Sequence, residues 1–454
     1  MLPLPDLSTL SHAEKDALIR ALWSRVETLS RRVAELEARL GEPPKDSGNS
    51  SVPPSRDRKA NRPRRPGGLR REASVGRVGG GRALHADPDA VVVAKLTGCP
   101  HCQAAMADGD QHLVERYDKI ELPPVTPVVT RVERHGGTCR CCGARILAPV
   151  PAGLEPGSPF GARIAALAVY LRYAQAISYQ RLSRLFADLY GLGISEGALA
   201  NLFARVKPRF DDRGAAILER LRCSRLIASD ETGARVNGRT EWEWVFQNEA
   251  VCLHVIRPSR ARAVVAEVLA GHRPQVWVSD LYGAQQGHAA QWQVCLAHQL
   301  RDCVFAIEAG DTILAPRIKP ILLRICAICR RADRLADSTL LQYRADLDRR
   351  LSAALALQPT NRHGIRLRKR FAKCRDSLLT CLTDRTVPPT NNASERDIRP
   401  STIFRKVTNG FRSTWGRDLY ASVRSVLNTA RRQRKTAFLA ISETIAGTPL
   451  FDTG

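Results

Sequence analysis

Two short apolar stretches of the chain each end in an aspartate. Val276–Ser279 is typical of a buried strand and is followed by Asp280, and Arg225–Ser229 has the same form and is followed by Asp230. A single aspartate after a strand is ordinary turn chemistry. Two of them predict paired carboxylates at one edge of a sheet, which suits a divalent metal site for phosphoryl transfer. The alternative is two unrelated turn aspartates.

A candidate for the third acid lies much later, in Thr390–Pro400. Glu395 is expected to begin a short helix that crosses the sheet edge beside the two aspartates. Three carboxylates can hold two Mg²⁺ (or Mn²⁺) ions, because these ions prefer hard oxygen ligands. One ion would activate water or a DNA 3′-hydroxyl, and the other would stabilise the leaving oxygen. Glu231 should point away from Asp230 on an extended chain, and Glu308 is the next acid to test in place of Glu395.

Paired cysteines form a second group with chemical potential. Two CxxC pairs, each near a turn-forming Gly or Pro, predict one structural zinc site with four thiolates. Its expected ligands are Cys99, Cys102, Cys139 and Cys142. Cys141 could replace either of the last two, and free thiols are the alternative. Lys119–Arg134 could supply a ribbon hairpin. A further pair, Cys326 and Cys329, lies in an apolar helical run and is expected in a core.

The charge balance indicates a polyanionic partner. Lys and Arg number 70 against 45 Asp and Glu, a formal net charge of +25, which favours nucleic acid or an anionic membrane. No stretch approaches the ~20 apolar residues of a membrane span, and the amino terminus has no secretory signal pattern. The chain is therefore expected to be cytoplasmic, with its 13 cysteines as thiols or metal ligands.

Basic residues that could contact DNA gather in two places. Residues 43–82 are rich in Arg, Pro and Gly and poor in apolar residues, so this segment should be disordered in the absence of a partner. It could follow the DNA phosphates or place arginines in a minor groove. A solvated linker without a binding role is an equally good interpretation. The second group surrounds Glu395, and the alternative to DNA contact there is a solvated charged surface. His298 could equally be a structural histidine. The candidates are Arg62, Arg64, Arg65, His298, Arg301, Arg396, Arg399, Arg405 and Lys406.

The amino-terminal stretch 12–40 has the clearest periodicity. Two apolar series recur every seven residues, with β-branched residues dominating the first and Leu the second: Ile19, Val26, Val33 and Leu40, and Leu22, Leu29 and Leu36. This pattern favours a parallel two-stranded coiled coil, and hence a homodimer or higher oligomer. The alternative is one amphipathic helix packed on its own domain.

The remaining elements frame the acids. Helices are expected at Ile164–Tyr173, Tyr179–Tyr190 and Ser195–Val206, a pattern compatible with a helix-turn-helix. Strands follow at Arg225–Ser229, Glu241–Gln247 and Val251–Arg257, then a helix at Ala261–Ala270, the strand before Asp280, and a fifth strand at Gln293–Ala297. This is the opening order of an RNase H-like α/β core, and residues 304–387 look like a helical insertion into it.

Several blocks resemble the IS66-type DDE transposases: SDETG (229–233), SDLYG (279–283), CLAH followed by RD (295–302), PPTNNASERDIRP (388–400) and FRKVTNGFRSTWG (404–416). Leu300 departs from the pattern, because many relatives carry Arg there. The resemblance covers nearly the whole chain. It implies Asp230, Asp280 and Glu395 as the acidic triad, element ends and target DNA as partners, a nucleoid-associated bacterial location and accessory proteins encoded by the same element.

These expectations combine into one domain plan: 1–44 coiled coil, 45–90 basic linker, 91–150 zinc-ribbon module, 151–220 helix-turn-helix-like region, 221–303 first part of the RNase H-like core, 304–387 insertion, 388–435 second part with the Glu, and 436–454 tail. The expected function is transposition by two-metal-ion phosphoryl transfer. Two alternatives remain: a DNA-binding regulator with an inactive core, and a metal-dependent nuclease without strand transfer.

Overall fold

The computed structural model describes residues 10–40, 42–50, 52 and 82–451. The chain forms two units. The larger comprises Met1–Asp57, Val132–Leu185 and Gly193–Gly454, and the smaller comprises Arg58–Arg131 and Phe186–Leu192. The main sheet and its covering helices belong to the larger unit.

A five-stranded mixed sheet forms the centre of the larger unit. Its order is β5-β4-β3-β6-β7, with β3, β6 and β7 parallel and β4 antiparallel to both β3 and β5. The strands are β3 (Leu226–Val236), β4 (Arg239–Gln247), β5 (Cys252–Arg257), β6 (Val276–Ser279) and β7 (Gln291–Val294). The predicted mixed α/β core is confirmed.

Two strands differ most from expectation. The first strand continues seven residues beyond Ser229 to Val236, because β4 pairs with it along its whole outer half. The fifth strand lies at Gln291–Val294 instead of Gln293–Ala297. Cys295 already caps the helix that follows, so the chain leaves the sheet there.

Eleven helices follow α1 in the described part of the chain. They are α2 (Ala162–Val169), α3 (Tyr179–Tyr190), α4 (Glu196–Arg222), α5 (Arg262–Leu269), α6 (Leu296–Glu308), α7 (Ala315–Cys329), α8 (Asp337–Ala356), α9 (Arg362–Lys373), α10 (Asn392–Thr408), α11 (Thr414–Arg432) and α12 (Ala437–Ala446). Ser195 accepts a hydrogen bond from the Ala198 N–H, which confirms it as the N-cap of α4. That helix is much longer than expected and leads directly into β3. The helix-turn-helix itself stays a prediction.

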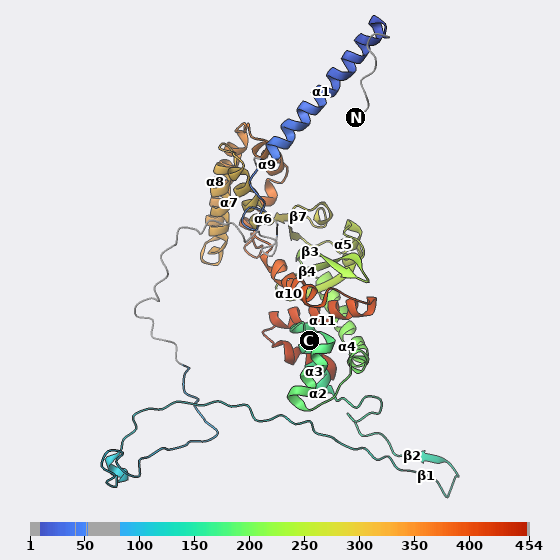
Figure 1. The fold of residues 1–454 in the computed structure, drawn as a ribbon, viewed down its shortest axis with the longest axis vertical. Coiled ribbons are helices and arrows are strands. Elements are labelled where there is room, and N and C mark those ends of the chain that lie inside the picture. The colour runs from blue at the N-terminus through green and yellow to red at the C-terminus, as the bar shows by residue number, and fades with distance from the viewer. Residues whose placement is uncertain (1–9, 41, 51, 53–81, 452–454) are drawn as a thin grey trace. The chain divides into compact units, whose positions relative to one another are not determined.

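The carboxyl-terminal helices cover one part of the sheet. Contacts join α10 to β3 and β4, and α11 to β5 and α4 (Figure 1). Residues of β6 and β7 instead pack in a core with α6 to α9, which includes Val278, Val294 and Ile325. Cys326 is buried in this core and Cys329 packs against it, as expected for that pair. Residues 304–387 thus form a helical body beside the sheet.

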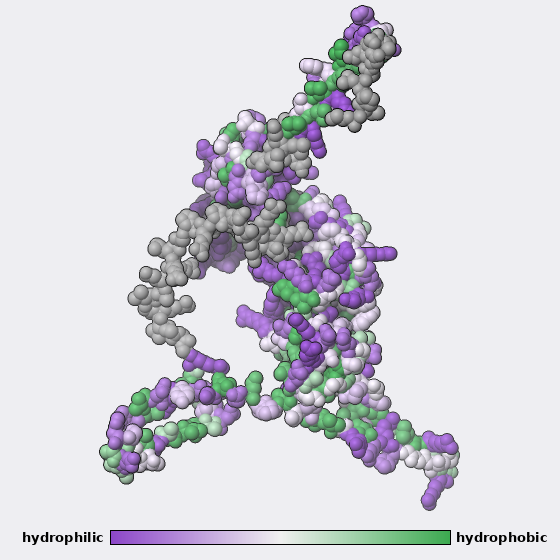
Figure 2. All heavy atoms as spheres, viewed as in Figure 1, coloured by the Kyte–Doolittle hydropathy of each residue, from purple (hydrophilic) through white to green (hydrophobic). Residues whose placement is uncertain are grey.

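The amino-terminal helix α1 (His12–Leu40) exposes its apolar residues (Figure 2). Ile19, Leu22, Val26, Leu29 and Val33 have 52–62% of their surface exposed. A helix that packed on its own domain would bury these side chains, so the exposure favours a partner helix. Dimerisation remains a prediction.

The two cysteine pairs lie in tight turns of the same form, one in each unit. The Cys99 N–H donates to the Ala104 carbonyl, and the Cys139 N–H donates to the Ala144 carbonyl, both at 2.8 Å. The second turn joins a small hairpin of β1 (Gly136–Thr138) and β2 (Arg145–Leu147). Residues 119–134 form neither strand nor helix, so the expected ribbon hairpin there is wrong: the hairpin flanks the second cysteine pair.

Candidate active site

The register of two parallel strands places the first two acids side by side. Ala228 of β3 lies opposite Val278 of β6. Asp230 and Asp280 each lie two residues further along, and side chains two residues apart share a face of an extended strand. The Asp280 carboxylate accepts a hydrogen bond from the Tyr282 N–H (2.9 Å), which fixes it in the turn after β6.

Helix α10 brings the third acid near the first two, close enough for its charge to act on Asp230. Glu395 lies in the first turn of α10. Asn391, the residue before α10, donates from Nδ2 to the Ser229 carbonyl (2.8 Å), and its backbone N–H donates to the Cys295 Sγ (3.1 Å). These contacts fasten the start of α10 to the residue before Asp230. They give a physical role to the first part of the NNASERD block.

The acids influence one another electrostatically. Burial raises the pKa of Asp230 well above its ordinary value. The negative charges of Glu231, Asp280 and Glu395 raise it further. The aspartates receive no ion pair from Lys or Arg among the described residues. A divalent cation would offset this repulsion.

Glu395 retains an unused ligand atom. Its Oε1 is buried without a hydrogen-bond partner, although His298 Nε2 lies 3.7 Å away and Arg301 lies 3.9 Å from Oε2. Both distances exceed a hydrogen bond. A buried carboxylate oxygen with no donor fits a metal ligand. His298 and Arg301 thus lie beside Glu395, and Cys295 joins His298 and Glu395 in one group of potential ligands.

Glu231 is engaged elsewhere. Its Oε1 accepts two hydrogen bonds from Arg260 (2.6 and 3.1 Å), and its Oε2 accepts one from Gln285 (2.6 Å). Arg260 is itself stacked on Tyr282 and Trp242. Glu231 therefore stabilises the turn after β6 through its bonds to Arg260 and Gln285. The position of Arg260 could not be inferred from the sequence around it.

Comparison with known protein families decides the family. The profile described as "Transposase IS66 family" matches residues 157–418, more than half of the chain. The chain belongs to the IS66 family of transposases. A second profile, a family of unknown function (DUF6444), matches residues 2–87 of this IS66-family chain. No curated protein matches it.

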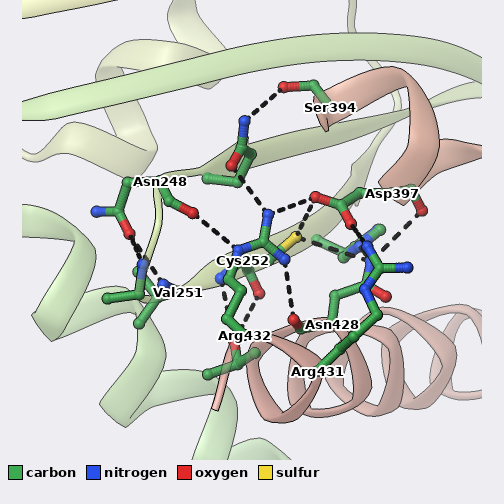
Figure 3. A network of polar contacts seen from close by, with 12 residues as sticks. Asn248, Val251, Cys252, Ser394, Asp397, Asn428, Arg431 and Arg432 are labelled. Carbon is green, nitrogen blue, oxygen red and sulfur yellow. Dashed lines mark hydrogen bonds and ion pairs between the residues drawn. The ribbon is translucent and has the colours of Figure 1, made fainter. Parts of the chain in front are cut away.

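A buried polar network holds α10 of the IS66-family chain in place (Figure 3). The Asp397 side chain is fully buried and forms ion pairs with Arg431 (2.7 Å) and Arg432 (2.6 Å) of α11. The Cys252 thiol donates to the same carboxylate (3.5 Å), and burial raises the pKa of this thiol so that it keeps its proton. Asp397 therefore joins α10 to both α11 and β5.

The network continues to the sheet edge that carries Asp230. Arg432 also donates to Gln247 Oε1 (2.9 Å), Gln247 donates to Ser394 Oγ (3.2 Å), and Ser394 donates to Asn391 Oδ1 (2.7 Å). Asn391 in turn binds the Ser229 carbonyl. An unbroken chain of hydrogen bonds thus runs from α11 to the residue before Asp230. The sequence block revealed the motif but not these partners: Gln247 and Ser229 lie 147 and 162 residues from Ser394 and Asn391, and Arg432 lies 35 residues from Asp397.

Replacing Asp397 with Ala should therefore destabilise the fold strongly. The change leaves Arg432, whose side chain is only 12% exposed, without its counter-charge, at a cost of about 3–5 kcal/mol. Urea unfolding measures it, with Arg396→Ala on the exposed side of the same helix as the control. Arg396→Ala should change the free energy of unfolding by less than about 0.5 kcal/mol. Equal losses from the two variants would contradict the role given to Asp397.

A cavity of about 710 Å³ opens beside the acids. Asp280 and His298 line one part of it, and Arg262, Arg370 and Lys373 add positive charge. Trp292 and Tyr282 also contribute to its wall. Sequence reasoning missed these cations. The basic run in α9, residues 366–373, was the available signal, but only the fold shows that α9 lies beside α6.

Besides His298 and Arg301, the predicted DNA contacts fall into three groups. Arg396, Arg399 and Lys406 are exposed on α10, spaced so that they share one helix face. Arg405 is partly buried, and its guanidinium donates to Thr232 Oγ1 (3.4 Å), just past Asp230 on β3. Arg62, Arg64 and Arg65 lie outside the described residues.

Proposed function

We propose that this IS66-family chain is a DDE transposase whose RNase H-like core cleaves DNA at its element's ends and transfers the strand. The convergence of Asp230, Asp280 and Glu395 from β3, β6 and α10 carries this proposal. Membership of a transposase family supports it. The strand order, with an antiparallel β3-β4-β5 half and parallel β6 and β7, agrees with an RNase H-like core.

The three acids would hold Mg²⁺ or Mn²⁺. When bound, the ions would lower the pKa of an attacking water or hydroxyl and stabilise the leaving oxygen. The chain's own contribution is positional. Asn391 holds α10 against β3, the Tyr282 N–H orients Asp280, and His298 and Arg301 stand beside Glu395 at distances that leave its Oε1 unengaged.

The cations around the acids would hold the DNA. Arg396, Arg399, Arg405 and Lys406 are proposed to contact phosphates on one side, together with His298 and Arg301. Arg262, Arg370 and Lys373 line the cavity on the side of Asp280. Arg62, Arg64 and Arg65 are proposed to reach DNA from the basic linker. Phosphate contacts of this kind position a duplex without reading its sequence.

Zinc is proposed to bind the four cysteines of the two CxxC pairs, Cys99, Cys102, Cys139 and Cys142. The backbone N–H groups of Cys102 and His101 lower the pKa of the Cys99 thiol, and those of Cys142 and Cys141 do the same for Cys139. The thiolate is the form that binds zinc. Cys139 also interacts with the Cys142 side chain and not with that of Cys141, which supports Cys142 as the fourth ligand.

The function is tested by incubating the purified chain and Mg²⁺ with its own element's ends. The proposal expects cleavage at the ends and joining of the 3′-ends to a second duplex. Equal cutting of a shuffled duplex without joining would indicate a nuclease. Binding to the ends without any cutting would indicate a regulator with an inactive core. Addition of the element's accessory proteins shows whether they are required.

Assembly through α1 gives a further prediction. Changing Leu29 and Leu36 to Asn should weaken self-association and paired-end complexes, because both lie on the proposed apolar seam. Binding to a single end should survive, since the basic residues lie elsewhere. Sedimentation velocity and gel shifts measure the two effects. The control changes Glu27 and Arg31, two exposed positions on the face of α1 opposite the seam. An unchanged oligomer with normal pairing would contradict the coiled coil.

In the described part of the chain, no helix has the length and apolar character needed to cross a membrane.

A further inference from the structure

The segment after α1 is folded against the insertion. Residues 42–50 belong to the stretch that the sequence assigns to the end of the coiled coil and the start of a basic linker. In the structure Asn49 and Ser50 are only 4% and 8% exposed. We propose that residues 42–50, here called the anchor, fasten the amino-terminal helix to helices α6 and α9, and that α6 is thereby held against the catalytic acids.

The anchor is a turn built by its own side chains. The Asp46 carboxylate accepts from the N–H groups of Gly48 (2.7 Å) and Asn49 (3.2 Å). Asn49 Oδ1 accepts from the Asp46 N–H (2.8 Å), and Ser50 Oγ donates to the Asp46 carbonyl (2.6 Å). Such local bonds favour Asp, Asn and Ser in turns. Residues 46–50 (DSGNS) therefore form a turn of defined conformation, whereas a linker needs no fixed conformation.

One end of the anchor contacts the carboxyl terminus of α6. Asn49 Nδ2 donates to Glu308 Oε2 (2.7 Å) as well as to the Pro44 carbonyl (3.1 Å). Glu308 is the last residue of α6. A carboxylate at this end of a helix is unfavourable for the helix itself, because the carbonyl groups there carry partial negative charge. Its contact with Asn49 gives this glutamate a role.

The other end contacts the amino terminus of α9. Glu42 Oε1 accepts from His363 Nε2 (2.8 Å) and pairs with Arg362. Arg362 is the first residue of α9, where a negative charge is favourable. Between these ends, the Lys45 ammonium lies 5.3 Å from the centre of the Phe305 ring on α6. Glu42 thus places a negative charge at the amino terminus of α9, whereas the contact at the carboxyl terminus of α6 is made by the neutral amide of Asn49.

Helix α6 connects this surface to the active site. Its first turns carry His298 and Arg301 beside Glu395. Its last residue binds Asn49, about 15 Å away at 1.5 Å per residue. Asp302 and Arg370, an ion pair between α6 and α9, line both the cavity at the acids and a second cavity of about 450 Å³ beneath the anchor. Only Gly41 separates the last residue of α1 from Glu42, so the carboxyl end of α1 must lie near this surface.

Hydrogen exchange of the full chain, without DNA or metal, tests the anchor. Glu308→Ala removes an exposed side chain and leaves the residues of the turn unchanged. Amide exchange in residues 46–50 should become about tenfold faster, because a charge-assisted hydrogen bond is lost. Exchange in the last turn of α6 should stay equal or slow down, because an unfavourable helix-end charge is gone. Asn49→Ala should instead speed exchange at the ends of both α6 and α9.

The control is Asn201→Ala, an exposed asparagine on α4, which should leave all three segments unchanged. Combining Asn49→Ala with Glu308→Ala should add nothing to the larger single effect in residues 46–50, because the two residues share one contact. Unaltered exchange of residues 46–50 in Glu308→Ala would overturn the proposal. The measurement involves no cleavage, so a failure of the transposase assignment would leave its outcome intact.

Discussion

Changing Asp230, Asp280 or Glu395 to Ala should reduce end cleavage by at least about a thousandfold, while binding to the ends remains close to normal. Each change removes a proposed metal ligand, and a bound ion contributes several kcal/mol to the transition state. The basic residues that would contact phosphates are untouched. Cleavage rates at saturating DNA and gel-shift affinities measure the two effects separately.

The matched control is Glu249→Ala, which removes an exposed acid from the turn between β4 and β5 and should leave both measurements unchanged. Glu308 was the alternative third acid by sequence, but it lies at the far end of α6 and binds Asn49. Full cleavage by Glu395→Ala would refute the acidic triad.

The first two acids could be placed from sequence because the information is local. An apolar run followed by Asp predicts a strand end, and parallel strands align such ends. The parallel register that pairs Ala228 with Val278 confirms this inference. The length of β3 was underestimated, because its outer half depends on β4 and not on its own apolar pattern.

The support of Glu395 could not be predicted in the same way. Asn391, Ser394 and Asp397 are visible as a polar block, but their partners Gln247 and Arg432 come from β4 and α11. Nothing in a helical periodicity identifies which distant residue neutralises a buried carboxylate. The anchor was missed for a related reason: its Pro, Gly and Ser content indicates a linker, whereas its burial depends on Glu308 and His363.

Changing Cys99 to Ser should remove the proposed zinc and unfold the module around it. Binding of a structural zinc is worth about 10–16 kcal/mol in small zinc modules, and binding is coupled to folding. Metal analysis should find one zinc per chain in the unaltered protein and none in the variant. Proteolysis within residues 91–150 should become faster in the variant.

Cys141→Ser is the matched control, because it alters the neighbouring thiol of the second turn and should retain the zinc. A chain that contains no zinc and has reactive thiols at all four proposed ligand positions would rule the site out. Zinc loss from Cys141→Ser together with retention by Cys142→Ser would instead make Cys141 the fourth ligand.

The position of Glu395 in the sequence, after the helical insertion, has a consequence during synthesis on the ribosome. Asp230 and Asp280 are translated before the insertion, and Glu395 and α11 after it. A nascent chain therefore carries the two aspartates for the time needed to make more than a hundred further residues, without the acid that completes the set. Until α11 emerges, β5 also lacks the helix that covers it, and Cys252 and Ile256, buried in the finished protein, lack that cover. A product that terminates within the insertion would keep this apolar surface exposed and be prone to aggregation, so the proposed DNA cleavage and a well-dissolved product should both be found only with nearly full-length chains.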